Sequence, residues 1–253
     1  METRIDNLVK WIREQVPEGG KAIIGISGGK DSTIAAALCV KALGAENVVG
    51  VMMPNGKQND INDSYAVCSV LGIDYLVINI GKTYDELCTA IDQNLFHRTT
   101  VEHYAEMNPM IKTNLPARLR MATLYAVAAL YPNSRVVNTC NYSEDYVGYS
   151  TKYGDAAGDF SPLGNLTVRE VLEIGDALGL PSHLVHKAPS DGMCGKTDED
   201  NLGFTYDELD DYIMHGKAPR TQETYERITH LHRVTRHKYE PMPVFSPVVL
   251  EEE

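Results

Sequence analysis

The sequence has few cysteines, and their placement excludes two common uses of this residue. The five are scattered, and no two of them form a C-x-x-C pair; they are Cys39, Cys68, Cys88, Cys140 and Cys194. An odd and dispersed set of thiols does not suit a disulfide framework, and it lacks the paired spacing of a zinc site. We therefore expect a reduced protein that is held together by a hydrophobic core.

Positive charge is also scarce. The formal net charge is −12, whereas a domain that binds nucleic acid without sequence preference carries a basic stripe. Nucleotide ligands remain open, because a few local lysines and arginines can hold their phosphates. We therefore expect no nucleic-acid partner.

Long apolar runs are missing as well. No stretch approaches the length of a membrane-spanning helix, and residues 1–6 lack the basic and then apolar pattern of a signal peptide. Low-complexity tracts and repeats of fixed period are absent too. These features predict a cytoplasmic protein with no membrane partner, organised as a single domain over residues 1–253.

Residues 21–38 contain the strongest local signal that is present. Ala22–Ile26 is an apolar, β-branched run typical of a strand buried on both faces, and Ile34–Leu38 favours helix. Ser27, Gly28 and Gly29 lie between them. A glycine turn between a strand and a helix gathers free amides at the positive end of a helix dipole, so this turn predicts a phosphate site.

The spacing of this turn identifies its class. Only three residues separate Gly25 from Gly29, and Asp31 follows Lys30, so the Walker A pattern and the dinucleotide G-x-G-x-x-G pattern both fail. Ser-Gly-Gly-x-Asp-Ser is instead similar to the pyrophosphate loop of enzymes that cleave ATP between its α and β phosphates. A bare carboxylate would repel phosphate, so Asp31 is a natural Mg²⁺ ligand. The alternative is a turn that merely links strand to helix.

The flanking segments predict an α/β fold. Helices are expected over residues 2–16 and 62–71, and strands over 22–26, 47–53 and 75–80. This alternation predicts a doubly wound parallel sheet with helices on both faces and ligands beyond the carboxyl ends of its strands. Ser27 and Gly56 follow two such ends.

The second half of the chain is more irregular. Residues 97–112 are expected to form a loop or a frayed helix, and Pro116 to occupy the first turn of a helix over 117–130. A strand is expected over 136–140, followed by a helix that contains Glu144 early in its course. The remaining expectations are helices over 83–95, 168–178, 206–214 and 223–234, a long functional loop or lid over 186–205, and a mobile tail over 241–253.

Several polar residues in this half could carry chemistry, although each also has an ordinary interpretation. Glu144 could share a metal with Asp31, or it could simply satisfy a helix dipole, which residue type alone favours. Lys152 could neutralise an anion and Asp155 could accept a proton, or both could belong to a solvated loop. Arg118 and Arg120 point to different helix faces, and His237 with Lys238 is typical of surface charge.

Taken together, the motifs resemble those of the NAD synthetases over roughly residues 3–240. The motifs that carry this likeness are Gly25–Ser32, Met53–Gln58 with Asp60 and Asp63, Thr139 with Glu144, Thr151–Asp155, Pro189-Ser190, Gly195–Glu199 and Gly203–Asp210. Thr-Lys-Tyr-Gly-Asp at 151–155 is the most discriminating of them. No amidohydrolase domain is attached, so the chain resembles the ammonia-dependent form, and the resemblance implies the fold of the adenine nucleotide α-hydrolases.

The resemblance implies a two-step ligase reaction. The nicotinate carboxylate of deamido-NAD attacks the α-phosphorus of ATP, and ammonia then displaces AMP to give NAD. It implies that ATP, a co-substrate, contacts Gly25, Ile26, Ser27, Gly28, Gly29, Lys30, Asp31, Ser32, Met53, Gln58, Thr139 and Ser190. Deamido-NAD would contact Arg118, Lys152, Asp159, His237 and Lys238. Asp31 and Glu144 would bind Mg²⁺, and Asp155 is the candidate for deprotonating ammonium.

The resemblance also implies partners and leaves rivals. The family forms homodimers through the helix equivalent to 117–130, and a separate glutaminase stays open as the source of ammonia. The rival interpretations are another ATP pyrophosphatase, either GMP-synthetase-like or tRNA-thiolating, and a nucleotide-binding sensor without turnover. The chain departs from the family pattern at Val168, usually a lysine, at Asn138, usually glycine, and at Cys194, often tryptophan.

Overall fold

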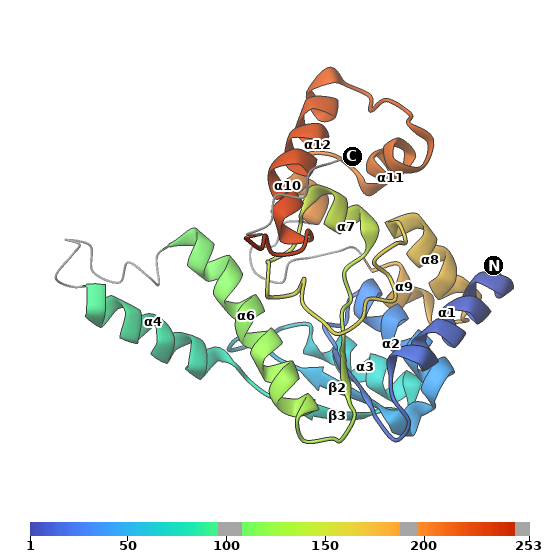
Figure 1. The fold of residues 1–253 in the computed structure, drawn as a ribbon, viewed down its shortest axis with the longest axis vertical. Helices are drawn as coiled ribbons and strands as arrows, with labels where there is room; N and C mark the ends of the chain where they lie inside the picture. The colour runs from blue at the N-terminus through green and yellow to red at the C-terminus, as the bar shows by residue number, and fades with distance from the viewer. Residues whose placement is uncertain (96–107, 188–196, 246–253) are drawn as a thin grey trace.

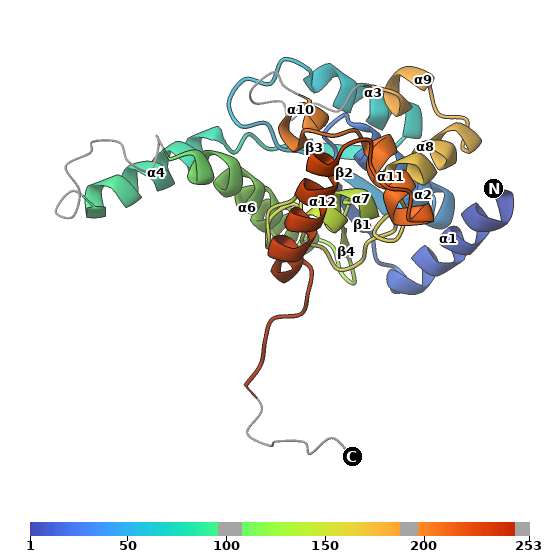
Figure 2. The same cartoon turned by 90° about the horizontal axis from the view of Figure 1, so that it is seen from above.

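The computed structural model describes residues 1–95, 108–187 and 197–245, and within these ranges its four strands form one parallel sheet. The strands are β1 (Ala22–Gly25), β2 (Val48–Met52), β3 (Asp74–Val77) and β4 (Arg135–Val137), in the order β3-β2-β1-β4; Figure 1 shows the fold, and Figure 2 labels all four strands. Ile24 lies opposite Gly50 on one side and Val137 on the other. The carboxyl ends of the two central strands therefore meet where the glycine turn begins.

Helices cover both faces of the sheet, which confirms the predicted architecture. The first face packs on α1 (Glu2–Gln15), α2 (Lys30–Leu43), α3 (Ile61–Leu71), α8 (Val168–Ala177) and α9 (Ser182–Val185). The second face packs on α6 (Pro109–Ala128), which in turn contacts α4 (Gly81–Leu95). In two perpendicular views α4 extends away from the body of the molecule (Figures 1 and 2).

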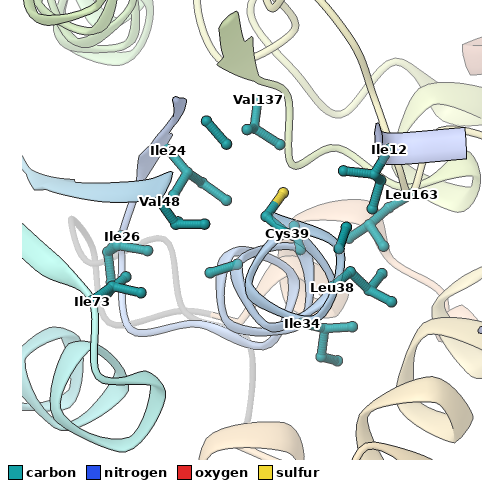
Figure 3. Packing of buried hydrophobic residues seen from close by; sticks show 14 of the residues in the cluster. Ile12, Ile24, Ile26, Ile34, Leu38, Cys39, Val48, Ile73, Val137 and Leu163 are labelled. Carbon is teal, nitrogen blue, oxygen red and sulfur yellow. The ribbon is translucent and has the colours of Figure 1, made fainter. Parts of the chain in front are cut away.

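Alternation along the strands explains how two cores form. Ile24 and Val48 pack with Leu38 and Ile12 on the first face, where α2 is surrounded by apolar side chains (Figure 3). Ile23, one residue earlier, points to the second face and packs with side chains of β2 and α6. Because successive strand residues point to opposite faces, a continuous apolar run supplies both cores.

A third cluster lies beyond the carboxyl ends of the strands. It unites α7 (Tyr142–Val147), α10 (Asp198–Leu202), α11 (Tyr206–His215) and α12 (Gln222–Thr235), which is followed by the 3₁₀ turn Arg236–Lys238. Leu209 and Ile228 are fully buried at its centre. These helices form a cap above the sheet, on the side where ligands bind in such folds.

The predicted start of the long helix was wrong. Helix α6 begins at Pro109, and Pro116 lies inside it and is buried. The Asn108 side chain accepts hydrogen bonds from the amides of Met110 and Ile111, and a proline at the first helical position has no amide that needs a partner. Of the predicted loop or frayed helix over 97–112, residues 96–107 lie outside the described residues.

Three other boundaries also differ from prediction. Strand β3 ends at Val77, although the amides of Ile78 and Ile80 still reach the β2 end of the sheet, and β4 ends at Val137. The predicted lid over 186–205 contains α10, whose cap is Thr197, so only its 188–196 segment lies outside the described residues. The single-domain organisation and the mobile tail stay predictions, the latter described only to residue 245. No helix within the described ranges is both long and apolar enough to span a membrane.

Candidate active site

The glycine turn joins β1 to α2 as the sequence predicts. The Ile26 amide donates to Val51 O at 3.0 Å, so the chain stays in register with β2 for one residue beyond β1. Gly28 then adopts φ +81°, a conformation that side chains rarely allow, and Gly29 becomes the N-cap of α2. No side chain from the described residues caps this helix, so its first amides remain available to an anion.

Two serine hydroxyls hold the turn in shape. Ser27 Oγ lies 3.1 Å from Ser32 Oγ and accepts the Gly29 amide at 3.2 Å, while Ser32 Oγ donates to Gly29 O. Ser32 is buried, and its side chain faces this network. The predicted ATP contacts at Ser27 and Ser32 are thus located in a preorganised loop. Ile26, by contrast, packs its side chain into the core, which leaves only backbone groups for a ligand.

The turn is packed directly against the start of α3. A side chain at Gly28 would place its Cβ 2.9 Å from Asp63 Cβ and 3.0 Å from the Ser64 amide nitrogen. Asp63 in turn forms an ion pair with Lys187 at 2.5 Å, and Lys187 also binds Asp60 at 3.0 Å. Lys187 therefore connects the segment before residue 188 to the phosphate turn.

Two carboxylates converge beside the turn. Asp31 lies in the first turn of α2, and Glu144 lies in the first turn of α7. Asn141 joins them: its Nδ2 donates to Asp31 Oδ1 at 3.1 Å, and its Oδ1 accepts the Glu144 amide at 3.0 Å. Burial raises the pKa of Glu144 well above its usual value, and the neighbouring Asp31 carboxylate raises it further.

This pair suits a magnesium ion, which proteins bind through one or two carboxylates while water and substrate phosphates fill the other positions. Asp31 and Glu144 supply those two carboxylates, from elements that meet beside a phosphate-binding turn. The described residues contain no group of three or more metal-ligating side chains, so they offer no closed protein cage. Capping of α7 and binding of a metal are compatible uses of Glu144.

Lys30 stands at the centre of this charge cluster. Its side chain is 6% exposed, and Nζ lies 2.6 Å from Asp31 Oδ2. The side chain that is predicted to contact ATP is therefore directed at the acidic pair.

The segment after β2, which contains two of the predicted ATP contacts, lies close to the turn. Met53 is buried, and a Cβ at Gly25 would lie 3.3 Å from Met53 Cε. Gln58 donates to Asp60 Oδ1 at 3.0 Å. Thr139, which follows β4, is partly buried two residues beyond the strand.

Four of the predicted deamido-NAD residues gather around the 148–152 segment. Arg118 Nε donates to Lys152 O at 3.3 Å, and Lys152 Nζ donates to His237 O. Lys238 Nζ donates to Gly148 O and Ser150 O at 2.6 and 2.8 Å. Three elements distant in sequence thus bring their positive charges together, which isolated surface residues would not do.

Asp155 and Asp159 occupy different settings. Asp155 Oδ1 accepts the Thr151 amide at 2.8 Å. Desolvation raises the pKa of Asp155, and the hydrogen bonds from Thr151 oppose that rise. Asp159 accepts the Val136 amide at 2.7 Å and the Tyr125 hydroxyl at 3.3 Å, so it also anchors β4. A polar cavity of about 320 Å³ is lined by Asn138, Asp145, Ala156, Gly158, Asp159, Phe160, Ser161, Gly164 and Asn165.

The departures from the family pattern have local explanations in two cases. Asn138 Nδ2 donates to Asp155 O at 2.8 Å, so the residue in place of glycine ties down the 151–157 loop. Val168 is buried, and its amide donates to Ser143 Oγ at 3.1 Å. The neighbouring Arg169 pairs with Asp211 and Asp207 and does not replace a lysine at 168. Ser190 and Cys194 lie outside the described residues.

Sequence reasoning assigned no role to three residues of the site. Asn141 bridges the acidic pair, Lys187 binds Asp60 and Asp63, and Arg120 Nε donates to Met53 O at 3.0 Å. An asparagine three residues before a glutamate is a capping signal that could have revealed the first. Pairings between distant segments, such as those of Lys187 and Arg120, leave no comparable pattern in a single sequence.

Comparison with known proteins agrees with this geometry. The family model for NAD synthase matches residues 4–242. The NH(3)-dependent NAD(+) synthetase of Alkaliphilus metalliredigens is 38% identical over 240 residues, which cover 93% of this chain and 94% of the relative. That of Thermococcus kodakarensis is 40% identical over 212 residues, covering 83% of this chain and 78% of the relative.

Solved structures give the same answer with one variation. An NMN synthetase from Francisella tularensis superposes with a TM-score of 0.83 at 34% identity, covering 98% of both chains. An NH3-dependent NAD synthetase from Campylobacter jejuni superposes with a TM-score of 0.74 at 25% identity, covering 97% of this chain and 98% of that chain. With its pyrophosphate loop, its acidic pair and a family match over nearly its whole length, the chain belongs to the NAD synthase family.

Proposed function

We propose that the chain is an ammonia-dependent NAD synthetase, a ligase that amidates deamido-NAD with ATP. The observation that carries this proposal is the meeting of Asp31 and Glu144 beside the Gly28 turn, with Asn141 joining the two carboxylates. Full-length similarity to NH(3)-dependent NAD(+) synthetases supports the choice of substrates.

The first step activates a poor electrophile. An oxygen of the nicotinate carboxylate attacks the α-phosphorus of ATP, the bond to the bridging oxygen breaks, and pyrophosphate leaves with that electron pair. The amides at the start of α2 hold the departing phosphates, and they are fixed before the reaction by the serine network. Asp31 and Glu144 would hold Mg²⁺, which neutralises phosphate charge when bound.

The second step forms the amide. The nitrogen lone pair of ammonia attacks the activated carbonyl carbon, AMP leaves with the electrons of the carbon–oxygen bond, and the nitrogen loses one proton to solvent to give the neutral amide. Ammonium has no lone pair, so a base must take one of its protons first. We assign this role to Asp155, whose carboxylate is held by the Thr151 amide and whose pKa is raised by desolvation.

Positive charge at the 148–152 segment fits the other substrate. Lys152, Lys238 and His237 come from two elements that contact each other, and Arg118 joins them from α6. A dinucleotide carries a pyrophosphate that these groups can neutralise. We assign deamido-NAD to this surface, with Asp159 lining the adjoining cavity.

A second candidate differs only in the size of the acceptor. The Francisella tularensis protein of 0.83 TM-score is an NMN synthetase, which favours amidation of the mononucleotide in place of the dinucleotide. The activation chemistry is identical, so substrate comparison decides between the two.

One assay tests both candidates. The purified chain is mixed with ATP, Mg²⁺ and ammonia, and with either deamido-NAD or nicotinate mononucleotide; amidated product and AMP are measured. We expect kcat/KM for the dinucleotide to exceed that for the mononucleotide by at least about tenfold, or ~1.4 kcal/mol of transition-state binding. The opposite preference would select the second candidate, and ATP binding without AMP release would indicate a sensor.

Two variants test the roles of Asp31 and Lys152 in the same assay. Asp31→Ala should abolish turnover, and a wild-type rate would refute its assignment to the metal. Lys152→Ala should raise KM for deamido-NAD by about tenfold through loss of one charge contact, with a smaller effect on KM for ATP.

We further propose that the chain forms a homodimer through α6 and acts in the cytoplasm. The exposed face of α6 carries Ala122, Tyr125 and Ala126, and Ala129 follows at its C-cap; these four exposed side chains form a largely apolar stripe. A second copy of the chain is the partner that this surface would accept. A separate glutaminase as the source of ammonia stays a prediction.

A further inference from the structure

Lys30 is a buried lysine in an unusual position. It is the first residue of α2 and directly precedes Asp31, one of the two carboxylates assigned to the metal. Its side chain is 6% exposed, whereas lysines are almost never so buried unless they are paired. A charge in such a place needs a partner that outweighs its lost hydration.

The ion-pair partner of Lys30 is Asp31, one of the two carboxylates assigned to the metal. Nζ lies 2.6 Å from Asp31 Oδ2 and 5.7 Å from the centre of the Tyr206 ring. A lysine side chain is charged at neutral pH, and a carboxylate oxygen at 2.6 Å stabilises that charge. Lys30 is therefore an ammonium ion in this cluster.

Both oxygens of the Asp31 carboxylate are occupied in this arrangement. Oδ2 binds the Lys30 ammonium, and Oδ1 accepts the Asn141 amide at 3.1 Å. A cation that binds Asp31 must therefore displace a donor or share an oxygen with it. A metal ion repels the Lys30 ammonium more strongly than the neutral Asn141 amide, because the ammonium carries a charge of the same sign.

The cluster also contains a place for a displaced ammonium. The Tyr206 side chain is 4% exposed, and its hydroxyl is buried with no hydrogen-bond partner among the described residues. This hydroxyl is attached to the same tyrosine ring that Lys30 Nζ faces at 5.7 Å. Movement of Nζ toward this hydroxyl would satisfy an orphan oxygen.

We propose that Lys30 is a built-in counter-cation that competes with the divalent metal for Asp31, so that metal binding requires the ammonium to leave Oδ2. In the absence of metal the ammonium neutralises two carboxylates that would otherwise repel each other. This inference deepens the metal site of the proposed function and rests on that assignment of Asp31 and Glu144.

The test measures metal binding without nucleotide or substrate. Mn²⁺ is titrated into the wild-type chain, Lys30→Met and Lys41→Met, and affinity is read from calorimetry and from the electron paramagnetic resonance signal of free Mn²⁺. Lys41 is an exposed lysine on the same helix and serves as the matched control. Lys30→Met should bind Mn²⁺ at least about tenfold more tightly, since it removes a like charge at contact distance, while Lys41→Met should match wild type.

Unchanged or weaker binding by Lys30→Met would overturn the proposal. Removing the ammonium leaves two partly buried carboxylates without a cationic partner, so the variant should be less stable without metal. Its Tm should consequently rise more with added Mg²⁺ than the wild-type Tm does. Lys30→Gln retains a donor for Asp31 without the charge, and it takes the place of Lys30→Met if the latter does not fold.

Failure here is distinguishable from failure of the proposed reaction. Tighter Mn²⁺ binding by Lys30→Met supports the competition even if no NAD is formed. If the chain makes NAD but Lys30→Met binds Mn²⁺ no more tightly than wild type, the proposed function stands and the proposed competition is refuted.

Discussion

At the scale of single residues, Gly28 sets the shape of the phosphate turn. Its φ of +81° and the 2.9 Å approach of Asp63 leave no room for a side chain. We expect Gly28→Ala to lower the free energy of unfolding by about 1–3 kcal/mol, the cost of backbone strain at such a site. Displacement of the turn should also raise KM for ATP, which steady-state kinetics would measure.

Gly179→Ala is the matched control for this substitution. Gly179 has φ +70°, but a Cβ added there would meet no atom within 4 Å, and the residue follows α8 away from the turn. Backbone strain should therefore reduce the stability of this variant without changing KM for ATP. An equal change of KM in both variants would mean that strain, and not the shape of the turn, affects nucleotide binding.

Asp145 gives a prediction that depends on pH. Burial and the nearby Asp155 raise its pKa to about 6. A carboxyl whose pKa is higher in the folded chain prefers to be protonated there, so its ionisation costs stability above about pH 6, and this cost vanishes as the pH falls toward ~3.9. Asp145→Asn should therefore raise the free energy of unfolding by about 1 kcal/mol at pH 8, after allowance for partial exposure.

Urea unfolding at several pH values checks this sign. The advantage of Asp145→Asn should be nearly constant above about pH 6.5 and shrink between about pH 6 and pH 4, while the exposed Asp74→Asn should show no such trend. An advantage that is independent of pH would show that the substitution acts through packing and not through charge.

Residue patterns predicted some of this site and missed the rest for a physical reason. Asp31 and the glycines follow from the demands of a phosphate turn, whereas for Glu144 residue type alone favours a helix-dipole role and only the family resemblance favours the metal. Lys187 and Arg120 hold the site through contacts across 124 and 67 residues of chain. Such pairings depend on how the elements pack, and a single sequence gives no spacing from which to infer them.

At the scale of elements, helix α7 connects secondary structure to the acidic pair. Its N-cap Asn141 completes a capping box with Glu144, and the same side chain donates to Asp31. We expect Asn141→Ala to cost about 1–2 kcal/mol of stability, the usual loss for an N-cap. It should also lower kcat by about tenfold, because Asp31 loses the donor that orients it.

Thr167→Ala separates these two effects. Thr167 caps α8 with a capping box of the same kind, and its side chain bonds Glu170 and Met214. Thermal or urea unfolding should show a comparable loss of stability, with kcat unchanged. A similar loss of kcat in both variants would indicate that activity follows stability alone.

The elements of the first half were more predictable than those of the second. Strand, turn and helix alternate clearly up to α3, and the apolar runs fix their identity. Pro109 and Pro116 both suit a helix start by residue type, and the Asn108 cap decides between them in favour of Pro109. Helix α10 spans only Asp198–Leu202, which is too short for periodicity to reveal.

At the scale of the whole molecule, the sheet and its cap have different origins in the sequence. The parallel sheet follows from regular alternation, because crossover connections are nearly always right-handed and place helices on both faces. The cap of α7, α10, α11 and α12 follows from a separate apolar cluster around Leu209 and Ile228. The site lies where the two meet, which explains why Asp31 comes from the sheet side and Glu144 from the cap.

The substrate site could also depend on the association of two copies of the chain through α6. The stripe of Ala122, Tyr125, Ala126 and Ala129 consists mainly of small residues on one exposed helix face. Small side chains let two helices approach closely, and the same helix carries Arg118, which contacts the Lys152 backbone. A dimer through α6 would therefore place a second copy beside the surface assigned to deamido-NAD.

If the proposed dimer forms, we expect Ala126→Glu to convert it to monomer, because the substitution introduces a charge at the centre of the stripe that a close helix contact must desolvate. Sedimentation equilibrium should show a rise of at least about a hundredfold in the dissociation constant, or ~2.7 kcal/mol. Ala177→Glu, at an exposed alanine near the end of α8, is the matched control and should remain dimeric. KM for deamido-NAD could rise in Ala126→Glu and not in Ala177→Glu, while the monomeric Ala126→Glu chain keeps its Tm. That result would show that both copies contribute to the substrate site. A monomeric wild-type chain would contradict the proposed dimer.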